Sequence, residues 1–199
     1  MEHPLEMPVF PLGSVLFPAG RLALRIFEPR YVEMTRACIR DGSPFGVSLI
    51  RAGYEVGQPA IPCEVGCTAR IVEWKTVGQD RFALQAQGES KFRIRERRAT
   101  PAGLIVARVE LVEPADPLPL PERHAAMKVF LQRLQQEAGP SALPQPLRLD
   151  DAAWVGNRIA ELLPVAPERK QRVLESDDPL AALDEIGRWI GELLQDPPA

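Results

Sequence analysis

Hydrophobic and polar residues alternate along the first part of the chain. In residues 21–26, Leu22, Leu24 and Ile26 alternate with arginine or alanine, and residues 81–87, 91–98 and 104–111 repeat the pattern. A period of two residues with one polar side is typical of half-buried strands in antiparallel sheets. The apolar segments 45–50 and 67–74 add two further strands. Residues 1 to 113 are therefore predicted to form a β-rich domain whose strands are mostly antiparallel.

One segment of this first part has helical spacing instead. Tyr31, Met34 and Cys38 recur three or four residues apart, which places them on one face of a helix. Pro29 suits the first turn of that helix, and Gly42 is a suitable stop.

The period changes after the proline-rich segment 113–121. Its four prolines favour an extended, semi-rigid connection. Beyond it we expect three main helices and a short one over 167–175. The three apolar stripes are Met127, Phe130, Leu131, Leu134 and Ala138; Val155, Ile159 and Leu162; and Leu183, Ile186, Ile190 and Leu193. The sequence thus predicts an α+β chain with a β-rich domain over 1–116 and a helical bundle over 117–199.

Two pairs of aspartates precede helical stripes in this second part. They are Asp150 with Asp151, and Asp177 with Asp178, the latter followed by Pro179. Acidic side chains at such positions accept hydrogen bonds from the free N–H groups of the first helical turn. Capping is therefore the expected role of these carboxylates, rather than acid–base chemistry.

The composition is that of an ordinary globular protein. Of 199 residues, 45% are hydrophobic and 26% are charged, and the net charge is −3, which favours neither nucleic acid nor an anionic membrane as partner. No apolar run approaches the ~18 residues of a membrane span, and we find no signal-peptide pattern. Three cysteines argue against a disulfide framework. We expect a cytoplasmic protein that does not bind a membrane.

Motifs for catalysis or cofactors are missing from the sequence. It has no phosphate-binding loop, no nucleophile elbow and no metalloprotease helix. The two histidines, His3 and His124, are not expected in a rigid cleft. Cys38, Cys63 and Cys67 could offer three zinc ligands, but nothing completes a tetrahedral set, and Cys38 and Cys67 are better explained as core residues. We therefore predict no enzyme activity, metal or cofactor; hydrolysis by a cysteine is the minor alternative.

A basic run over residues 91–98 permits two interpretations. Simple alternation places Lys91, Arg93, Arg95 and Arg97 on one face of a strand. Such a face could contact phosphates, which would make the chain an RNA-binding module. It could equally be a solvated outer face that discourages edge pairing. Because no exposed aromatic residues are interleaved, as stacking on bases would require, the second interpretation is favoured.

The opening residues carry a recognisable pattern. Residues 7–31, MPVFPLGSVLFPAGRLALRIFEPRY, resemble the start of the Lon protease N-terminal domain, which is also called its substrate-binding domain. The matching residues are Pro8, Phe10, Pro11, Leu12, Leu16, Phe17, Pro18, Leu22, Leu24, Ile26, Phe27 and Glu28. Residues 65–71, 88–94, 107–110 and 162–186 resemble later family segments in the same order, with Lys91 in place of the usual arginine. The resemblance covers nearly the whole chain.

The resemblance implies a PUA-like pseudo-barrel with one helix, followed by a helical bundle. It implies a stand-alone member without ATPase and protease domains, and a non-catalytic role in binding unfolded or hydrophobic polypeptides or a protein partner. An adaptor or a chaperone-like factor in protein quality control would fit. The location of the binding surface and the oligomeric state are not indicated by the sequence.

Several motif residues have expected structural roles. Pro8, Pro11 and Pro18 should lie at strand ends or at a sheet edge, because proline cannot donate to a central ladder. Phe10, Leu16, Phe17 and Phe27 should anchor the core. Glu28 should accept hydrogen bonds from the N–H groups that begin the following helix.

Overall fold

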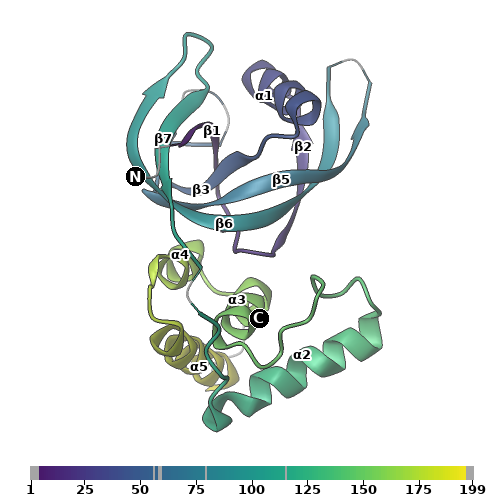
Figure 1. The fold of residues 1–199 in the computed structure, drawn as a ribbon, viewed down its shortest axis with the longest axis vertical. Helices are drawn as coiled ribbons and strands as arrows, with labels where there is room; N and C mark the ends of the chain where they lie inside the picture. Colours follow the sequence, from purple (N-terminus) through teal and green to yellow (C-terminus); the bar gives the residue numbers. More distant parts are fainter. Residues whose placement is uncertain (1–4, 56, 58–59, 79, 115, 196–199) are drawn as a thin grey trace. The chain divides into compact units, whose positions relative to one another are not determined.

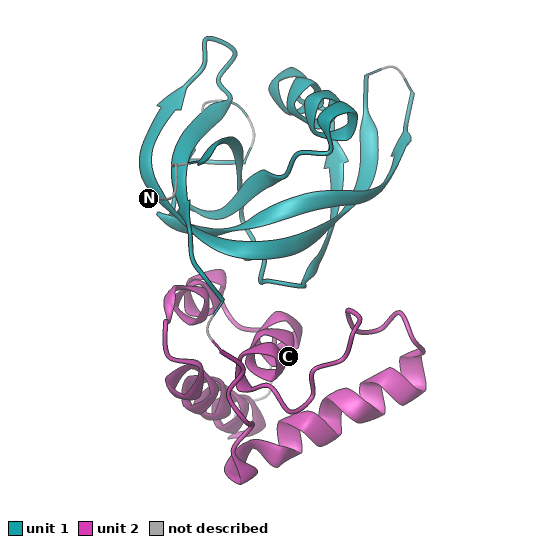
Figure 2. Cartoon of the chain, viewed as in Figure 1, with its two compact units in different colours: residues 1–114 teal, residues 115–199 magenta. Residues whose placement is uncertain are grey.

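The computed structural model describes residues 5–55, 57, 60–78, 80–114 and 116–195. The chain divides into two compact units, residues 1–114 and 115–199, which Figure 2 shows in different colours. That residues 1–116 and 117–199 behave as separate domains stays a prediction.

The first unit is a strongly curved sheet with one helix, α1, over part of it (Figure 1). Among the described residues, five strands close into a ring in the order β1-β7-β6-β5-β3, because β3 returns to pair with β1, while β2 joins β6 and β4 joins β3. The elements are β1 Leu5–Leu12, β2 Arg21–Ile26, α1 Pro29–Asp41, β3 Phe45–Ala52, β4 Ile61–Pro62, β5 Val65–Thr76, β6 Phe82–Ala99 and β7 Ile105–Leu111. The predicted pseudo-barrel with one helix is confirmed.

Strand β1 differs from the expectation for its prolines. Pro8 and Pro11 lie inside β1, and β1 is a member of the closed ring. Residues 5–9 of β1 pair antiparallel with β7, and residues 9–12 pair parallel with β3. The neighbour thus changes at Val9, so Pro8 is paired with β7 alone and Pro11 with β3 alone. Each proline therefore has a partner strand on one side only. On its other side the lack of an N–H group breaks no hydrogen bond of the sheet.

Alternation along β1 separates two buried clusters. Val9 belongs to the cluster inside the ring, whose members are Met7, Val9, Phe92, Ile94, Ile105, Ala107 and Val109. The adjacent Phe10 belongs to a larger cluster with the side chains of α1, including Tyr31, Met34 and Cys38, and with Cys67 of β5. The predicted core positions of Cys38 and Cys67 are therefore confirmed.

Two glycines make room for the ring of Phe92 inside the barrel. A Cβ atom at Gly46 would lie 2.9 Å from Cζ of Phe92, and one at Gly66 would lie 2.5 Å from the same atom. Real Cβ atoms do not approach carbon so closely. The segment around Gly66 in β5 and the segment around Phe92 in β6 thus fit each other sterically. This fit gives a physical reason for the family segments 65–71 and 88–94 noted in the sequence.

The turn from β2 into α1 departs from two expectations. Phe10, Leu16 and Phe17 are buried as predicted, but Phe27 is 55% exposed. Ile26 faces the core at the end of β2, so the residue after it faces outward. Glu28 makes no side-chain cap to α1 and instead pairs with Arg30, with 2.9 Å between Oε2 and Nη2. Buried Arg30 also donates to the Gly103 carbonyl at 3.0 Å.

The second unit is helical, and its helix starts agree with the sequence. Asp151 accepts hydrogen bonds from the N–H groups of Ala153 and Trp154 at the start of α3. Asp178 accepts from Leu180 and Ala181 at the start of α5. Capping is thus confirmed for Asp151 and Asp178, whereas Asp150 accepts a hydrogen bond from the ammonium of Lys128. The elements are a 3-10 turn η1 Glu122–His124 and helices α2 Ala125–Ala138, α3 Ala152–Leu162, α4 Pro167–Glu175 and α5 Pro179–Gln195.

The apolar stripe predicted on α2 is partly wrong. Met127 and Leu131 are buried, but Phe130 is 51% exposed. Residues 127 and 131 are four apart and share one face of a helix, whereas residue 130 is turned about 100° from its neighbour 131, as the 3.6-residue period dictates. The buried stripe of α2 is therefore narrower than the sequence suggested.

One buried and two half-buried charged side chains lie between α3 and α4. The guanidinium of buried Arg158 pairs with Glu161 at 2.8 Å, and the ammonium of Lys170 donates to the Glu161 carbonyl at 3.0 Å. Burial raises the pKa of Glu161 to about 7, although Arg158 and Lys170 act to lower it. Burial also lowers the pKa of Lys170. The charged form of the Glu161 carboxyl is thus disfavoured in the folded state.

We expect the substitution Gly66→Ala to reduce the free energy of unfolding by about 1–3 kcal/mol, because overpacking a well-packed core costs that much. Urea unfolding followed by circular dichroism measures it. The matched control is Gly191→Ala, since a Cβ at Gly191 has no neighbour within 4 Å and alanine favours a helix. Equal stability of Gly66→Ala and the unchanged protein would contradict the packing of Phe92 described above.

We also expect a pH dependence that depends on Glu161. Its folded pKa of about 7 lies above the ordinary 4.5, so the folded state holds the proton more tightly than the unfolded state. The resulting stabilisation is full below pH 4.5 and is lost as the pH rises through 7. Thermal melts at pH 5 and pH 8 should differ less for Glu161→Gln than for the unchanged protein. An identical pH dependence of the two proteins would rule this role out.

Candidate functional site

The basic run does not form the single face that simple alternation predicts. Arg93 of β6 is paired with Glu110 of β7, but a register shift follows between residues 94 and 96, and Arg97 is then paired with buried Ala107. Directly paired residues project on the same side of a sheet. The bulge therefore turns Arg97 to the side opposite Arg93.

Carboxylates accompany several cations of this strand. Arg95 pairs with Glu110, with 2.8 Å between its Nε and the carboxylate. Arg98 pairs with Glu6 at 2.8 Å, and Arg108 of β7 pairs with Glu96. These ion pairs reduce the local positive potential that phosphates would require. A nucleic-acid contact through Lys91, Arg93, Arg95 and Arg97 stays a prediction, but its geometric basis is weaker than the sequence suggested.

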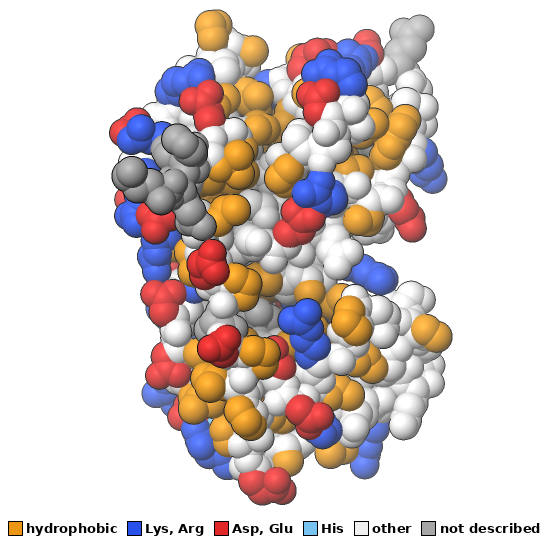
Figure 3. Space-filling model, viewed as in Figure 1, with side chains coloured by type: hydrophobic (Ala, Val, Ile, Leu, Met, Phe, Trp, Pro, Cys, Tyr) orange, Lys and Arg blue, Asp and Glu red, His pale blue; other side chains and the backbone are white. Residues whose placement is uncertain are grey.

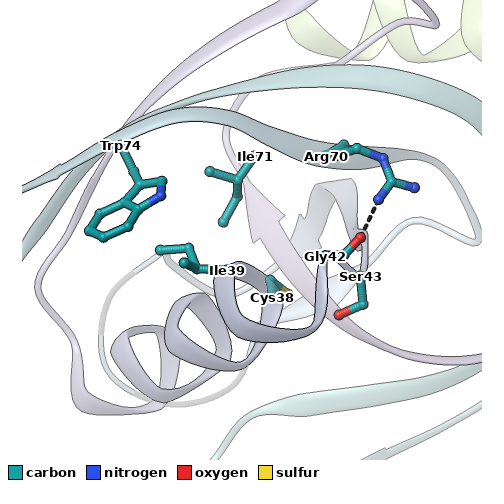
Figure 4. Close-up of a pocket in the computed structure, with 7 residues that line it drawn as sticks. All are labelled: Cys38, Ile39, Gly42, Ser43, Arg70, Ile71 and Trp74. Carbon is teal, nitrogen blue, oxygen red and sulfur yellow. Dashed lines mark hydrogen bonds between the residues drawn. The ribbon is translucent and has the colours of Figure 1, made fainter.

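A pocket lies between the C-terminal half of α1 and residues 70–74 of β5 (Figure 4). Its volume is about 120 Å³, and its lining residues are Cys38, Ile39, Gly42, Ser43, Arg70, Ile71 and Trp74. For comparison, a cavity of roughly 150 Å³ in another protein accepts a benzene ring. Figure 4 shows the side chains of Ile71 and Trp74 on β5 and that of Ile39 on α1 around this space. The pocket has room for one apolar side chain.

A bulge in β5 creates this lining. Ile71 is paired with Ala86 and Trp74 with Leu84, with a register shift between residues 71 and 73. Ala86 and Leu84 both belong to the core beneath α1, so Ile71 and Trp74 lie on the same side of the sheet. In a regular strand, residues three apart would lie on opposite sides. The extra residue, Val72, thus turns the side chain of Trp74 to the same side as that of Ile71, as bulges commonly do.

Charges around the pocket are paired with one another. Arg70 binds the carboxylate of Glu89 and donates to the Gly42 carbonyl at the end of α1. Arg36 on α1 pairs with Asp80 beyond β5. Arg40 pairs with Asp41 at 2.7 Å. The rim therefore offers no excess charge to an anionic or cationic ligand.

Apolar side chains extend beyond the pocket along β5. Trp74 is 52% exposed, and Val72 and Val77 are also exposed. The Trp74 ring contacts the Phe82 ring edge-on, with 6.1 Å between centroids. One side of the Trp74 ring is therefore packed, and the other side is open to solvent. Figure 3 shows hydrophobic side chains on the surface near α1 and the β5–β6 hairpin. We refer to the pocket together with Val72 and Trp74 as the α1–β5 groove, since Val77 alternates with Thr76 and lies on the other face of the strand.

The candidate catalytic groups are not arranged for chemistry in the described part of the chain. His124 is buried, and its Nε2 lies 2.8 Å from Oδ1 of Asp184, which also binds Arg123 and ties η1 to α5. Cys38 lies at the pocket, but burial raises the pKa of its thiol, which disfavours the reactive thiolate. Residues 5–55, 57, 60–78, 80–114 and 116–195 contain no cluster of potential metal ligands. His3 lies outside the described residues.

Comparison with known proteins gives a consistent result. The family model described as the ATP-dependent protease La (LON) substrate-binding domain matches residues 6–191. A Lon N-terminal domain protein from Xanthomonas campestris has 34% sequence identity and a TM-score of 0.77, with 93% of this chain and 98% of that chain covered. The N-terminal domain of a Mycobacterium avium complex Lon protease has a TM-score of 0.68 at 15% identity and shares the fold.

Full-length Lon proteases also match. Lon protease 2 of Myxococcus xanthus is 29% identical over 186 residues, which are 89% of this chain and 22% of that protein. The Lon protease of Paraburkholderia phytofirmans is 30% identical over 183 residues, 87% of this chain and 22% of that protein. The chain thus spans about a fifth of the length of these relatives. Within the part of the chain that the structure describes, no helix is long and apolar enough to cross a membrane.

The exposure of Trp74 can be tested directly by fluorescence. All three tryptophans lie within the described residues, and Trp154 and Trp189 are buried. We therefore expect acrylamide to quench mainly the emission of Trp74. The variant Trp74→Phe should keep a blue-shifted emission that acrylamide quenches weakly. If Trp74→Phe is quenched as strongly as the unchanged protein, the ring of Trp74 is not open to solvent and the groove is not formed as described.

Proposed function

Because the chain belongs to the Lon substrate-binding domain family, we propose that it binds polypeptides and that the α1–β5 groove is its binding site. The observation that carries this proposal is the half-exposed Trp74 beside a pocket that Ile39 and Ile71 help to line and whose rim charges are paired. A large exposed aromatic side chain that faces a pocket is a common anchor of protein–protein contacts.

The chemistry of the groove selects the kind of polypeptide. The lining offers apolar surface from Ile39, Ile71 and Trp74, and burying apolar area contributes about 25 cal/mol per Å² to binding. The pocket accommodates one apolar side chain at a time. In folded proteins such side chains are mostly internal, so the groove favours unfolded or partly folded segments over native surfaces.

The proposed role requires no chemistry by this chain. It binds an apolar segment and releases it unchanged, as an adaptor or a chaperone-like factor in protein quality control would. The three free cysteines suit the reducing conditions of the cytoplasm, where such a factor would meet unfolded chains.

A fluorescence anisotropy titration tests the proposal. The probe is a labelled peptide, Lys-Thr-Val-Thr-Phe-Thr-Val-Lys, blocked at both ends, whose apolar side chains alternate. We expect micromolar binding that changes little between 50 and 300 mM salt, because no net charge lines the groove. The substitution Trp74→Ala should weaken binding about tenfold, which corresponds to ~1.4 kcal/mol.

A matched control separates this groove from the rest of the surface. Phe130→Ala on α2 removes an aromatic side chain of nearly the same exposure and should leave binding within twofold. Loss of binding with Phe130→Ala but not with Trp74→Ala would place the site elsewhere. Absence of binding by the unchanged protein, or affinity that falls steeply with salt, would contradict the proposed function.

A further inference from the structure

Beside the α1–β5 groove, part of one edge of strand β5 has no partner strand in the described part of the chain. This strand runs over Val65–Thr76 and pairs with β6 along most of this length. On its other edge, β3 pairs with residues 67–69 of β5, since β3 begins at Phe45, directly after α1 and Pro44. Within the described residues no strand pairs with residues 71–76 on that edge. The ring thus closes on the first half of β5 and leaves the edge of the second half open.

The direction of the backbone groups on this edge follows from one hydrogen bond. The N–H of Val77 donates to the Arg81 carbonyl at 2.9 Å, and the residues before them pair in regular steps, Thr76 with Phe82, Lys75 with Ala83 and Trp74 with Leu84. In antiparallel pairs, hydrogen-bonded and non-hydrogen-bonded positions alternate. Thr76 and Trp74 therefore take the non-hydrogen-bonded positions, and their N–H and C=O groups point away from β6 toward the open edge.

We propose that an extended apolar segment of a client polypeptide adds to this edge as a further strand. The proposal rests on the proposed function and names its mode of binding. Backbone groups of the client bond to Trp74 and Thr76, and one client side chain enters the pocket beside Ile71 and Trp74. Backbone pairing supplies affinity that does not depend on sequence, and the pocket adds a preference for an apolar residue.

The dimensions and charges fit this occupant. Residues 71–76 offer an edge of six residues, or ~20 Å at 3.3 Å per residue. Side chains of an added strand alternate, so those facing α1 meet the apolar groove. Those on the other side lie beside Glu73 and Lys75, which are exposed and tolerate polar groups. A segment with alternating apolar and polar residues therefore matches both faces.

The outer edge of β2 is a less suitable acceptor. Among the described residues, strand β2 pairs only with β6, but its apolar residues Leu22, Leu24 and Ile26 are already packed against the core. Its other side presents Arg21 and Arg25, and charged residues of this kind discourage pairing at an edge. The pocket adjoins β5, which makes β5 the edge that can recognise a side chain.

Backbone methylation of the peptide probe tests the proposal on the full chain. In one version the amides of the valines and phenylalanine are N-methylated, and in the other those of the threonines. Each version blocks one edge of the extended peptide and keeps all side chains. We expect one version to bind at least tenfold more weakly than the parent peptide and the other to bind within threefold of it, because only one edge faces β5.

A pair of protein variants tests the same contact from the other side. Thr76→Pro removes an N–H that points to the open edge and leaves the ladder to β6 intact, since proline is tolerated where its nitrogen faces away from a partner strand. Thr76→Val keeps the N–H and is the matched control. We expect Thr76→Pro to weaken binding of the parent peptide at least fivefold relative to Thr76→Val, with circular dichroism checking that both fold.

The outcomes distinguish the two proposals. If the parent peptide binds and Trp74→Ala weakens it, but both methylated versions bind like the parent, the groove binds side chains and strand addition is overturned. Equal loss with both methylated versions also overturns it, because a strand added at one edge leaves its other edge free. If the parent peptide does not bind, the proposed function itself fails.

Discussion

Closure of the sheet into a ring is the constraint on which the β unit depends. For β3 to return to β1, it must pair with β5 over residues 67–69 and then leave toward β4. Only residues 42–44 separate α1 from β3, and among the described residues no strand pairs with the rest of this edge of β5. The open edge at residues 71–76 is therefore a consequence of how the barrel closes, and the groove beside it combines unpaired backbone groups with apolar side chains.

Two bulges determine what the strands present to their surroundings. The register shift at Val72 places Ile71 and Trp74 on the same side, beside α1. The shift between Ile94 and Glu96 separates Arg97 from Arg93. One bulge thus assembles the apolar groove, and the other divides the basic run. A bulge moves every following side chain to the other face, so both candidate surfaces are set by a single residue in each strand.

The sequence predicted the fold class well because alternation and helical spacing report burial directly. Most strands, α1, the four later helices and the caps at Asp151 and Asp178 follow from local patterns. No strand was predicted over β1 or β4, and the segments 81–87 and 91–98 form the single strand β6. The groove could not be predicted, because a bulge leaves no composition signal and the open edge depends on which strands pair. Phe27 and Phe130 were wrongly predicted to be buried for a related reason. A pattern of apolar residues does not show how far the neighbouring element extends over them. The family resemblance supplied what local patterns could not, namely the basis for the proposal that the chain binds polypeptides.

Amide hydrogen exchange followed by nuclear magnetic resonance tests the central claim most directly. In the free protein, the amides of Trp74 and Thr76 should exchange quickly, whereas that of Lys75, which bonds to β6, should be protected. Addition of the alternating peptide should protect Trp74 and Thr76 and leave α2 unchanged. Protection that appears on α2 around Phe130, with none at residues 71–76, would contradict the account.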